Sequence, residues 1–591
     1  MDQLKPNSAN SSPLTPLTFL DRAGITYGDS TSVIYGRKSY TWTQTNRRCL
    51  QLASSLSSIG IGRGHVVSVL SSNNLATYEL HFAVPMSGAT LNNLNLRLDH
   101  RTLSLLLRHS ESKLLFVHTL SQSLIHKALS LFPPNTPLPK LVLITDDTVA
   151  SHQMKTPLTN HVTVTETETE TEAKTVTTLD FIDTYEGLIA KGDPTFKWVK
   201  PNSEWDPITL NYTSGTTSSP KGVVHCHRGT FIMALDTLVD WCVPKNAVYL
   251  WTLPMFHSNG WSFPWGIAAV GGTNVCSRKI DAPTIYRLIE SHGVTHMCAA
   301  PVVLNMLTSF GRTEPLRKQV HVLTGGSPPP AGILKRAERM GFVVSHGYGM
   351  TETCGVVLSC AWKREWDLFS AAERARMKAR QGVRTAAATA EVDVVDLKWG
   401  VSVKRDGLTQ GEIVVRGACV MLGYFKDEEA TSKCIKNGWL HTGDVAVVHE
   451  DGYIEIKDRL KDVIISGGEN LSSVEVEAML YTHPAVSDVA VVARPDEFWG
   501  ETPCAFVKLK GRLERRPSEE EMVEFCRERL PHFMVPKTVV FRDELPRTST
   551  GKVQKYVLRM VARAMGSLPL PLPSPSPSPP PPPIITPSSR M

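Results

Sequence analysis

One segment of this sequence concentrates side chains that bind phosphate. Residues 212–222 read Tyr-Thr-Ser-Gly-Thr-Thr-Ser-Ser-Pro-Lys-Gly, directly after the strand-like run 208–210. Glycines let backbone N–H groups approach an anion, the hydroxyls donate hydrogen bonds, and Lys221 adds a positive charge. This composition predicts a polyphosphate-binding loop, with a Ser/Thr-rich surface turn as the alternative. It is not a Walker A loop, which needs Gly-Lys-Ser/Thr in that order.

Polar side chains suited to a nucleotide also occur further along the chain. In the segment His-Gly-Tyr-Gly-Met-Thr-Glu, Tyr348 lies between two glycines, where its ring can stack on a base or pack as a turn tyrosine in the core. Thr351 and Glu352 bring a hydroxyl and a carboxylate, which suit a hydrated hard cation such as Mg²⁺. Asp444, in a Thr-Gly-Asp turn, matches paired ribose hydroxyls and is otherwise a solvated loop charge.

Taken together, these segments resemble the adenylate-forming (AMP-binding) superfamily of acyl-CoA synthetases, luciferases and peptide-synthetase adenylation domains. The resemblance covers about residues 17–560 and depends on six ordered signatures: 212–222, 346–352, 438–444, 457–462, 466–470 and 546–552. It implies an α/β fold with a large N-terminal domain of β-sheets flanked by helices and a small mobile α/β C-terminal domain. Activation of a carboxylic acid as its acyl-adenylate is the implied chemistry.

The resemblance also implies a role for individual residues. Lys552, Thr351 and Glu352 are implied as catalytic, and Glu352 as the Mg²⁺ ligand. The residues implied to bind ATP or AMP are Thr213, Ser214, Gly215, Thr216, Thr217, Lys221, His346, Gly347, Tyr348, Gly349, Asp444 and Arg459. Lys461 falls at the hinge of the small domain. The residues implied to face the site in the second half-reaction are Ser466, Gly467, Gly468 and Glu469.

The implied reaction has two steps and needs ATP, Mg²⁺ and CoA. A carboxylate attacks the α-phosphate of ATP, which releases pyrophosphate, and a thiolate then attacks the acyl carbon of the acyl-adenylate. The protein mainly supplies position and charge neutralisation. Nothing after Met565 resembles a carrier domain, so free CoA is the expected acceptor. The alternatives are a non-CoA acceptor, or a degenerate ligase that acts as a binding scaffold.

The resemblance places an acyl pocket along three segments. Its expected residues are His257, Trp261, Val303, Met306, Gly325 and Gly326. The two glycines are expected to leave room, while the larger side chains reward flat or short apolar acids. These segments contain no Arg or Lys for a second carboxylate, which disfavours dicarboxylates. Stretches 295–306 and 362–382 are similar to a plant branch that activates short- or medium-chain fatty acids, benzoate or cinnamate. A cinnamate- or benzoate-like acid is expected first, and a C4 to C8 fatty acid second.

The order of apolar runs predicts how the chain is organised. Strand-like runs alternate with helical stretches, which favours α/β structure with largely parallel sheets. We expect a disordered N-terminus over residues 1–16, a large domain over 17–460 and a small domain over 461–565. The nearly pure Thr/Glu stretch 163–178 is expected to be a surface insertion, with a polar strand as the alternative.

Composition excludes several other classes of protein. A net charge of +6 over 591 residues, without a long basic run, does not indicate nucleic-acid binding. Eleven cysteines without a CxxC pair fit a reducing compartment, and His225, Cys226 and His227 lie too close together for ordinary metal ligation. We find no apolar run of transmembrane length and no signal peptide.

The end of the sequence is rich in proline. Eleven of the 40 prolines fall at 569–587. We expect a Pro-rich tail over 566–591, in which residues 568–583 form an extended polyproline II stalk. Ser589, Arg590 and Met591 resemble a Ser-Lys-Leu type address read by a peroxisomal import receptor. Peroxisomal localisation is therefore expected, with the cytoplasm as the alternative.

Overall fold

The computed structural model describes residues 7, 9–145, 161–162, 179–213, 221–326, 329, 331–387, 391–466, 469–511, 513, 515–548 and 552–569. The Thr/Glu stretch 163–178, Ser214, Gly215, Thr216, Thr217, Gly467, Gly468 and the tail from residue 570, with Ser589, Arg590 and Met591, lie outside the described residues. The chain divides into two compact units. The first is Met1–Lys461 with Arg547–Val553, and the second is Asp462–Pro546 with Gln554–Met591.

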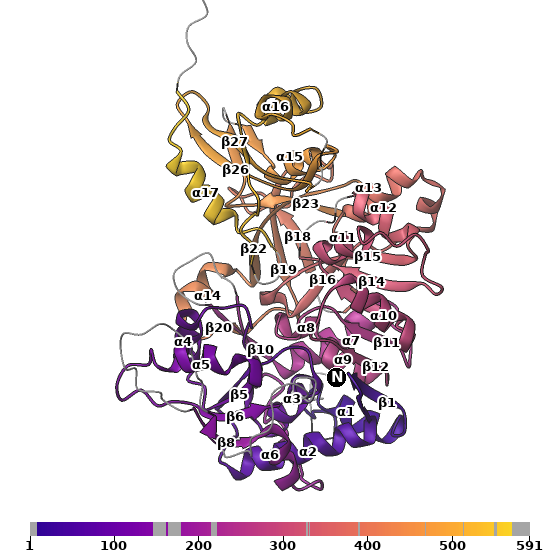
Figure 1. Ribbon diagram of the computed structural model, residues 1–591, viewed down its shortest axis with the longest axis vertical. Coiled ribbons are helices and arrows are strands. Elements are labelled where there is room, and N and C mark those ends of the chain that lie inside the picture. Colours follow the sequence, from indigo (N-terminus) through magenta and orange to yellow (C-terminus); the bar gives the residue numbers. More distant parts are fainter. Residues whose placement is uncertain are drawn as a thin grey trace, which may run out of the picture. The chain divides into compact units, whose positions relative to one another are not determined.

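A nine-stranded sheet in the first unit carries much of the candidate site (Figure 1). Its strands, in spatial order, are β17 (Val383–Arg384), β16 (Gly355–Ser359), β15 (Phe342–Met350), β14 (Val320–Thr324), β13 (His296–Ala299), β11 (Val248–Trp251), β12 (Thr273–Cys276), β1 (Thr31–Tyr35) and β2 (Lys38–Thr41). The pairs from β15 through β1 are parallel, whereas β2, β16 and β17 pair antiparallel at the two edges. The carboxyl ends of β13, β14 and β15 therefore come together, where ligands bind in α/β folds.

A second nine-stranded sheet carries the ends of the expected phosphate loop. Its strands, in spatial order, are β20 (Gly423–Tyr424), β10 (Gly222–Cys226), β9 (Pro207–Tyr212), β4 (Thr90–Asn93), β3 (Val66–Leu70), β5 (Leu114–His118), β6 (Lys140–Ile144), β8 (Leu179–Thr184) and β7 (His161–Val162). The middle of this sheet is parallel, as the buried apolar runs predict. At one edge β9, β10 and β20 pair antiparallel.

The main core of the first unit contains side chains from both large sheets and from helices between them. Helix α3 (Leu75–Met86) is buried at every position, including the polar Glu79 and His81, which therefore need partners inside the core. Helix α2 (Trp42–Ser58) begins with a capping box between Thr41 and Gln44. The other α-helices of this unit are α1 (Thr18–Thr26), α4 (His100–His109), α5 (Gln122–Leu129), α6 (Tyr185–Lys191), α7 (His227–Asp240), α8 (Ser258–Trp261), α9 (Phe263–Ala269), α10 (Ala282–His292), α11 (Pro301–Thr308), α12 (Ala331–Arg339), α13 (Ala371–Ala379) and α14 (Glu428–Cys434).

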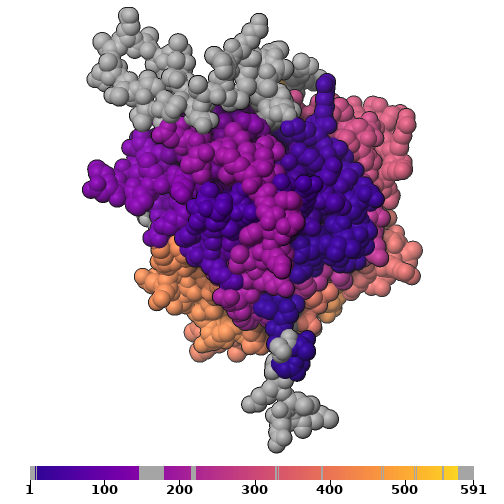
Figure 2. Space-filling model, turned by 90° about the horizontal axis from the view of Figure 1, so that it is seen from below, coloured from indigo at the N-terminus to yellow at the C-terminus, as the bar shows by residue number. Residues whose placement is uncertain are grey.

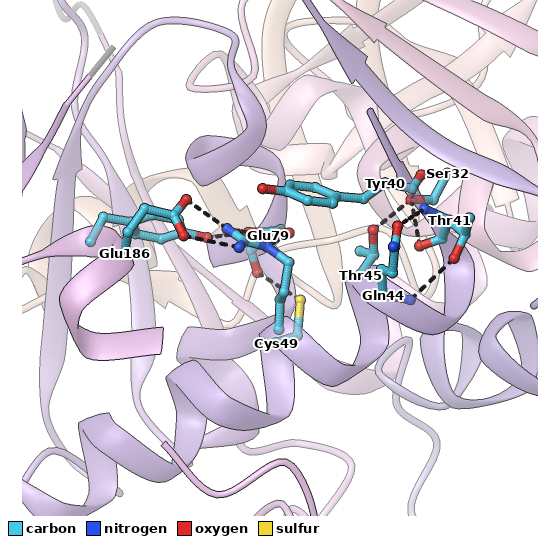
Figure 3. A network of polar contacts seen from close by, with 10 residues as sticks. Ser32, Tyr40, Thr41, Gln44, Thr45, Cys49, Glu79 and Glu186 are labelled. Atoms are coloured by element: carbon cyan, nitrogen blue, oxygen red, sulfur yellow. Dashed lines mark hydrogen bonds and ion pairs between the residues drawn. The ribbon is translucent and has the colours of Figure 1, made fainter. Parts of the chain in front are cut away.

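A buried ion pair joins α2, α3 and α6 (Figure 3). Arg48 of α2 donates from Nε to Glu79 Oε1 at 2.8 Å, and from Nη2 to Glu186 Oε1 at 2.8 Å. Tyr185 also donates to the Glu79 carboxylate. Glu79 is fully buried, so its charge depends on these donors. These helices belong to the indigo and purple part of the chain, which forms much of the face seen in Figure 2.

A smaller sheet in the first unit packs against the strand that carries Tyr348. Its strands are β18 (Glu391–Val395), β19 (Gly411–Arg416), β22 (Trp439–Val448) and β21 (Ile435–Lys436), with β23 (Ile454–Arg459) also paired to β22. A core cluster joins Ile413, Val415 and Ala446 of this sheet to Tyr348 and Val357 of β15 and β16. This packing brings the candidate residues of both sheets together.

The second unit is a small α/β body with its own core. Its strands are β25 (Glu469–Leu471), β24 (Ile464–Ser466), β27 (Gly500–Leu509) and β26 (Val486–Asp496), with β28 (Thr538–Phe541) parallel to β27. Its helices are α15 (Ser473–Leu480), α16 (Glu519–Arg527) and α17 (Lys555–Ala564). The segment Arg547–Val553, within the range expected for the small domain, belongs to the first unit instead.

The apolar runs located most elements to within a few residues. Helical spacing of apolar residues over 39–59 predicts a helix, and the short apolar runs 66–70 and 140–144 predict strands; the structure has α2, β3 and β6 at these positions. The stretch 362–382 forms a short 3₁₀ helix, Arg364–Leu368, followed by α13. Among the described residues, no helix has the length and apolar character to span a bilayer.

Candidate active site

Asp444 lies between a tyrosine and an arginine from different strands. It pairs directly with Arg459 in the register of β22 and β23, and Arg459 Nε lies 2.7 Å from Asp444 Oδ1. Tyr348 donates its hydroxyl to Asp444 Oδ2 at 2.6 Å. Burial, reinforced by Asp444, raises the pKa of Tyr348, while Asp444 raises the pKa of Arg459. Each carboxylate oxygen of the buried Asp444 thus has a partner, Arg459 for Oδ1 and Tyr348 for Oδ2. These two contacts fix the orientation of the carboxylate, which can act as a hydrogen-bond acceptor.

The Thr351–Thr353 turn joins β15 to β16 as a single 3₁₀ turn. It closes at Cys354, which has a left-handed φ of 58°. Glu352 is 8% exposed and accepts a hydrogen bond on Oε1 from the Tyr424 hydroxyl at 2.8 Å. A Cβ on Gly349 would overlap the carbonyl oxygen of Gly355, so only glycine lets β15 approach β16 here. The turn thus holds a carboxylate in one orientation.

The two ends of the expected phosphate loop are held by an antiparallel pair. Strands β9 and β10 pair with Tyr212 opposite Gly222, and the Thr213 N–H donates to the carbonyl oxygen of Lys221 at 3.1 Å. Lys221 Nζ lies 4.9 Å from the centre of the Tyr424 ring. Because Tyr424 also contacts Glu352, one side chain links the loop lysine to the candidate metal ligand.

Lys552 lies in a hairpin that groups with the first unit. The Thr548 N–H donates to the Lys552 carbonyl oxygen at 2.6 Å, and the Lys552 N–H donates to Thr548 Oγ1 at 3.1 Å. A Cβ added to Gly326, whose φ is +87°, would lie 3.3 Å from Lys552 Cε. Burial and then the charge of Arg459 lower the pKa of Lys552, against the effect of Asp444 and Glu352. Its ammonium therefore lies within electrostatic range of all three side chains.

The aromatic segment of the expected acyl pocket has an unusual backbone. Residues 258–262 all have positive φ angles, between 40° and 65°. Four of these five residues carry a side chain, so the conformation is strained, and it is held by buried packing around Trp261. Burial, followed by the charge of Lys552, lowers the pKa of the preceding His257 to about 4. His257 is therefore a neutral ring near Lys552 at physiological pH.

The glycine pair of the expected pocket does not simply leave room. A Cβ on Gly325 would lie 2.8 Å from the carbonyl oxygen of Gly347 and 3.2 Å from the ring of Trp261. The space beside Gly325 is thus filled by the backbone of the neighbouring strand and by the indole of Trp261. The expected acyl pocket is therefore narrower at this point than the two glycines suggest. Val303 and Met306 pack against the cluster under α10 and α12, which includes Leu304 and Leu334.

The remaining predicted residues have clear positions. His346 is buried, its Nδ1 lies 3.0 Å from the carbonyl oxygen of Arg380, and burial lowers its pKa to about 4. Lys461 is exposed at the end of the first unit. Ser466 and Glu469 pair across β24 and β25 in the second unit.

Two residues with direct contacts to the candidate site were missed by the sequence analysis. Tyr424 holds Glu352, and the buried His225 places Nε2 2.7 Å from the carbonyl oxygen of Thr351. Tyr424 lies in the two-residue strand β20, which is too short for a periodic pattern. In the sequence, His225 stands out only as part of a His-Cys-His run, which is too tight for ordinary metal ligation. Neither contact has a signal in residue spacing.

Comparisons with known proteins identify the family of this chain. The AMP-binding enzyme family matches residues 20–425, and the AMP-binding enzyme C-terminal domain matches residues 475–552. The 2-methylpropanoate–CoA ligase of Humulus lupulus is 62% identical over 96% of this chain and 98% of that protein. A probable peroxisomal acyl-activating enzyme of Arabidopsis thaliana is 61% identical over 96% of this chain and all of that protein. The o-succinylbenzoate CoA synthetase of Bacillus subtilis, solved with its acyl-adenylate, has a TM-score of 0.74 at 23% identity, covering 92% of this chain and 97% of that one.

The chain therefore belongs to the AMP-binding enzyme family, in the branch of plant acyl-activating enzymes. It is an AMP-forming acyl-CoA ligase, a class that consumes ATP with Mg²⁺ and forms a thioester with CoA. The predicted family, fold class and ligase activity are confirmed.

Proposed function

We propose that this ligase activates a small apolar monocarboxylic acid at the carboxyl ends of β14 and β15. The observation that carries this proposal is the convergence of Asp444, Glu352 and Lys552 in the first unit. Two oriented carboxylates and one partly desolvated ammonium can bind a ribose, a metal-bound phosphate and the attacking carboxylate. Each group is held before substrate arrives, so little reorganisation is needed.

The residues divide between binding and reaction. Asp444, aligned by Tyr348 and Arg459, accepts the ribose hydroxyls. Thr351 donates to the α-phosphate, and Lys221 with Thr213 holds the outer phosphates. Lys552 contacts the incoming carboxylate and the α-phosphate, where negative charge accumulates as the oxygen attacks and pyrophosphate leaves. The second unit contributes Ser466 and Glu469 to thioester formation, with Lys461 as the hinge.

Glu352 is the residue that would hold Mg²⁺. Its carboxylate is buried and accepts from Tyr424 on Oε1. A carboxylate oxygen, a threonine hydroxyl and substrate phosphates form the all-oxygen donor set that Mg²⁺ prefers. When bound, the metal neutralises phosphate charge.

The acid is proposed to be a short aliphatic one, with aryl acids as the second candidate. The Trp261 ring and the Gly347 backbone lie close to Gly325, which leaves less width for the acyl group on that side of the proposed pocket. The Humulus lupulus relative is named for 2-methylpropanoate, a branched four-carbon acid. The pocket segments hold no Arg or Lys, so a dicarboxylate would leave one carboxylate without a partner.

A CoA-ligase assay tests this substrate class. Purified protein with ATP, Mg²⁺ and CoA would be given 2-methylpropanoate, butyrate, hexanoate, benzoate, cinnamate and malonate. We expect the highest kcat/KM for one of the four- to six-carbon acids and no turnover of malonate. A preference for benzoate or cinnamate would favour the aryl alternative, and absence of turnover with every acid would favour a scaffold.

The role of Lys552 is tested by separating the half-reactions. We expect Lys552→Ala to abolish pyrophosphate release while thioester formation from a supplied acyl-adenylate survives. Equal loss of both half-reactions would contradict this role.

Peroxisomal localisation through Ser589, Arg590 and Met591 is also proposed. The support is the sequence of these residues and the 61% identical relative that is named as peroxisomal. An N-terminal fluorescent fusion of the full chain should enter peroxisomes, and removal of the last three residues should leave it cytosolic. A diffuse signal from the full chain would refute the address.

A further inference from the structure

His225 connects the phosphate-loop strand to the catalytic turn. It lies in β10, four residues after Lys221, and is 2% exposed. Its Nε2 lies 2.7 Å from the carbonyl oxygen of Thr351. A carbonyl oxygen only accepts, so Nε2 must carry the proton that is donated to it. The ring therefore joins strand β10 to the turn that carries Thr351 and Glu352.

The backbone of the turn at Thr351 is also held by hydrogen bonds from other segments. The same carbonyl oxygen accepts from the Cys354 N–H at 3.2 Å, and Cys354 is held in a left-handed conformation. Ser262 Oγ donates to the Cys354 carbonyl oxygen at 3.2 Å. On the other side, the Met421 N–H donates to the Glu352 carbonyl oxygen at 2.9 Å. The hydrogen bond from His225 links the first residue of this turn directly to strand β10, which begins just after Lys221.

The surroundings of His225 favour its donor role at any pH near neutrality. Burial opposes the charged ring, but the neighbouring Cys354 thiol, the Thr351 carbonyl and Glu352 outweigh it and raise the pKa of His225. Nε2 donates both in the Nε2-protonated neutral ring and in the imidazolium. The hydrogen bond to Thr351 therefore persists in either charge state.

We propose that His225 is a positioning residue for adenylation, which sets the distance between the Thr351–Glu352 pair and strand β10, the strand that begins directly after Lys221. It does not itself touch the reacting atoms. The inference rests on the proposed roles of Thr351 and Glu352. Since only the first half-reaction uses the triphosphate, the effect of His225 should fall on that step and on MgATP.

The test compares two substitutions in the full-length protein. His225→Leu removes the donor, whereas His225→Gln retains an amide N–H that can reach a backbone carbonyl. We expect His225→Leu to lower kcat/KM for MgATP in pyrophosphate release about tenfold, the size of one lost hydrogen bond. His225→Gln should recover to within about threefold of wild type, and thioester formation from a supplied acyl-adenylate should change less than about twofold in both.

A control separates positioning from loss of stability. His118, also 2% exposed, lies in β5 and accepts from the Leu120 N–H on Nδ1 at 3.2 Å. His118→Leu should lower the unfolding midpoint and leave MgATP kinetics unchanged. Three results would overturn the inference. They are an equal loss of kcat/KM for MgATP in His225→Leu and His225→Gln at matched folded fractions, an equal loss in both half-reactions, and no loss in His225→Leu.

Two further variants distinguish failure of this inference from failure of the proposed site. If Thr351→Val and Glu352→Gln both abolish adenylation while His225→Leu is silent, only the role of His225 is wrong. If Thr351→Val and Glu352→Gln leave adenylation intact, the proposed roles of the turn fail and the inference fails with them.

Discussion

Removing the hydroxyl of Tyr424 should weaken adenylation through Glu352. This hydroxyl donates to Glu352 Oε1 at 2.8 Å, and the ring lies under Lys221 Nζ at 4.9 Å. Burial and then Glu352 raise the pKa of Tyr424, so it remains a donor throughout the working pH range. Tyr424→Phe keeps the ring and removes the hydroxyl, with its bond to Glu352 and its contact with the Cys434 thiol.

The size of the effect follows from the kind of bond. A hydrogen bond to a charged group contributes about 1.5–3 kcal/mol. At about 1.4 kcal/mol per tenfold, its loss predicts a decrease of about tenfold to a hundredfold in kcat/KM for MgATP. Tyr424→Leu also removes the cation–π contact with Lys221, which should add a further loss of about threefold.

The assay is pyrophosphate release over a range of Mg²⁺ concentrations at pH 6, 7.5 and 9. We expect Tyr424→Phe to require more Mg²⁺ for half-maximal rate, by a factor that does not change with pH. Tyr286→Phe is the matched control, because that buried hydroxyl donates to the Leu307 carbonyl oxygen at 3.1 Å in a different cluster. A Tyr424→Phe enzyme with wild-type kcat/KM and Mg²⁺ dependence would refute the reasoning.

Three predictions concern stability. Glu79→Leu leaves the Arg48 guanidinium buried without its main partner. The free energy of unfolding in urea should therefore fall by about 3–5 kcal/mol. A loss below about 1 kcal/mol would contradict a buried ion pair. Gly349→Ala should yield little folded protein, because the added Cβ would overlap the carbonyl oxygen of Gly355. Gly62→Ala is the control and should fold normally, because its Cβ would have no neighbour nearer than 3.6 Å. A soluble, active Gly349→Ala protein would argue against this packing. Burial holds the pKa of His81, His227, His296 and His346 at about 4, below the unfolded value of about 6.5, so the unfolded chain binds protons that the folded one excludes. The thermal midpoint should therefore fall as the pH decreases from about 6.5 towards 4, and a midpoint that rises over this range would show the opposite sign.

The residues of the candidate site could be proposed from the sequence because their signatures are local. The residues at 212–222 and 346–352 bring glycines and hydroxyls together by sequence alone, and the adjacent apolar runs fold as β9 and β15. The alternating apolar runs also predicted the parallel sheets, since a strand covered by helices on both faces must be apolar along its length. The element types and the family were therefore within reach of the sequence.

Contacts between distant segments were not predictable in this way. Tyr348 meets Asp444 96 residues later, and Tyr424 meets Glu352 72 residues earlier, through packing between sheets. The glycine at 325 was expected to open space, whereas the tertiary structure fills that space with Gly347 and the Trp261 ring.

The sequence by itself determined the family and its ligase chemistry, because the six ordered signatures that resemble AMP-binding enzymes are local motifs. Only the tertiary structure decided how the side chains of these motifs are oriented. Asp444 and Glu352 accept hydrogen bonds from donors on other strands, and the carbonyl oxygen of Thr351 accepts one from His225 in β10. The physical reason is that burial makes an unpaired charge or carbonyl costly, so partners far apart in the chain are brought together by the packing of the sheets.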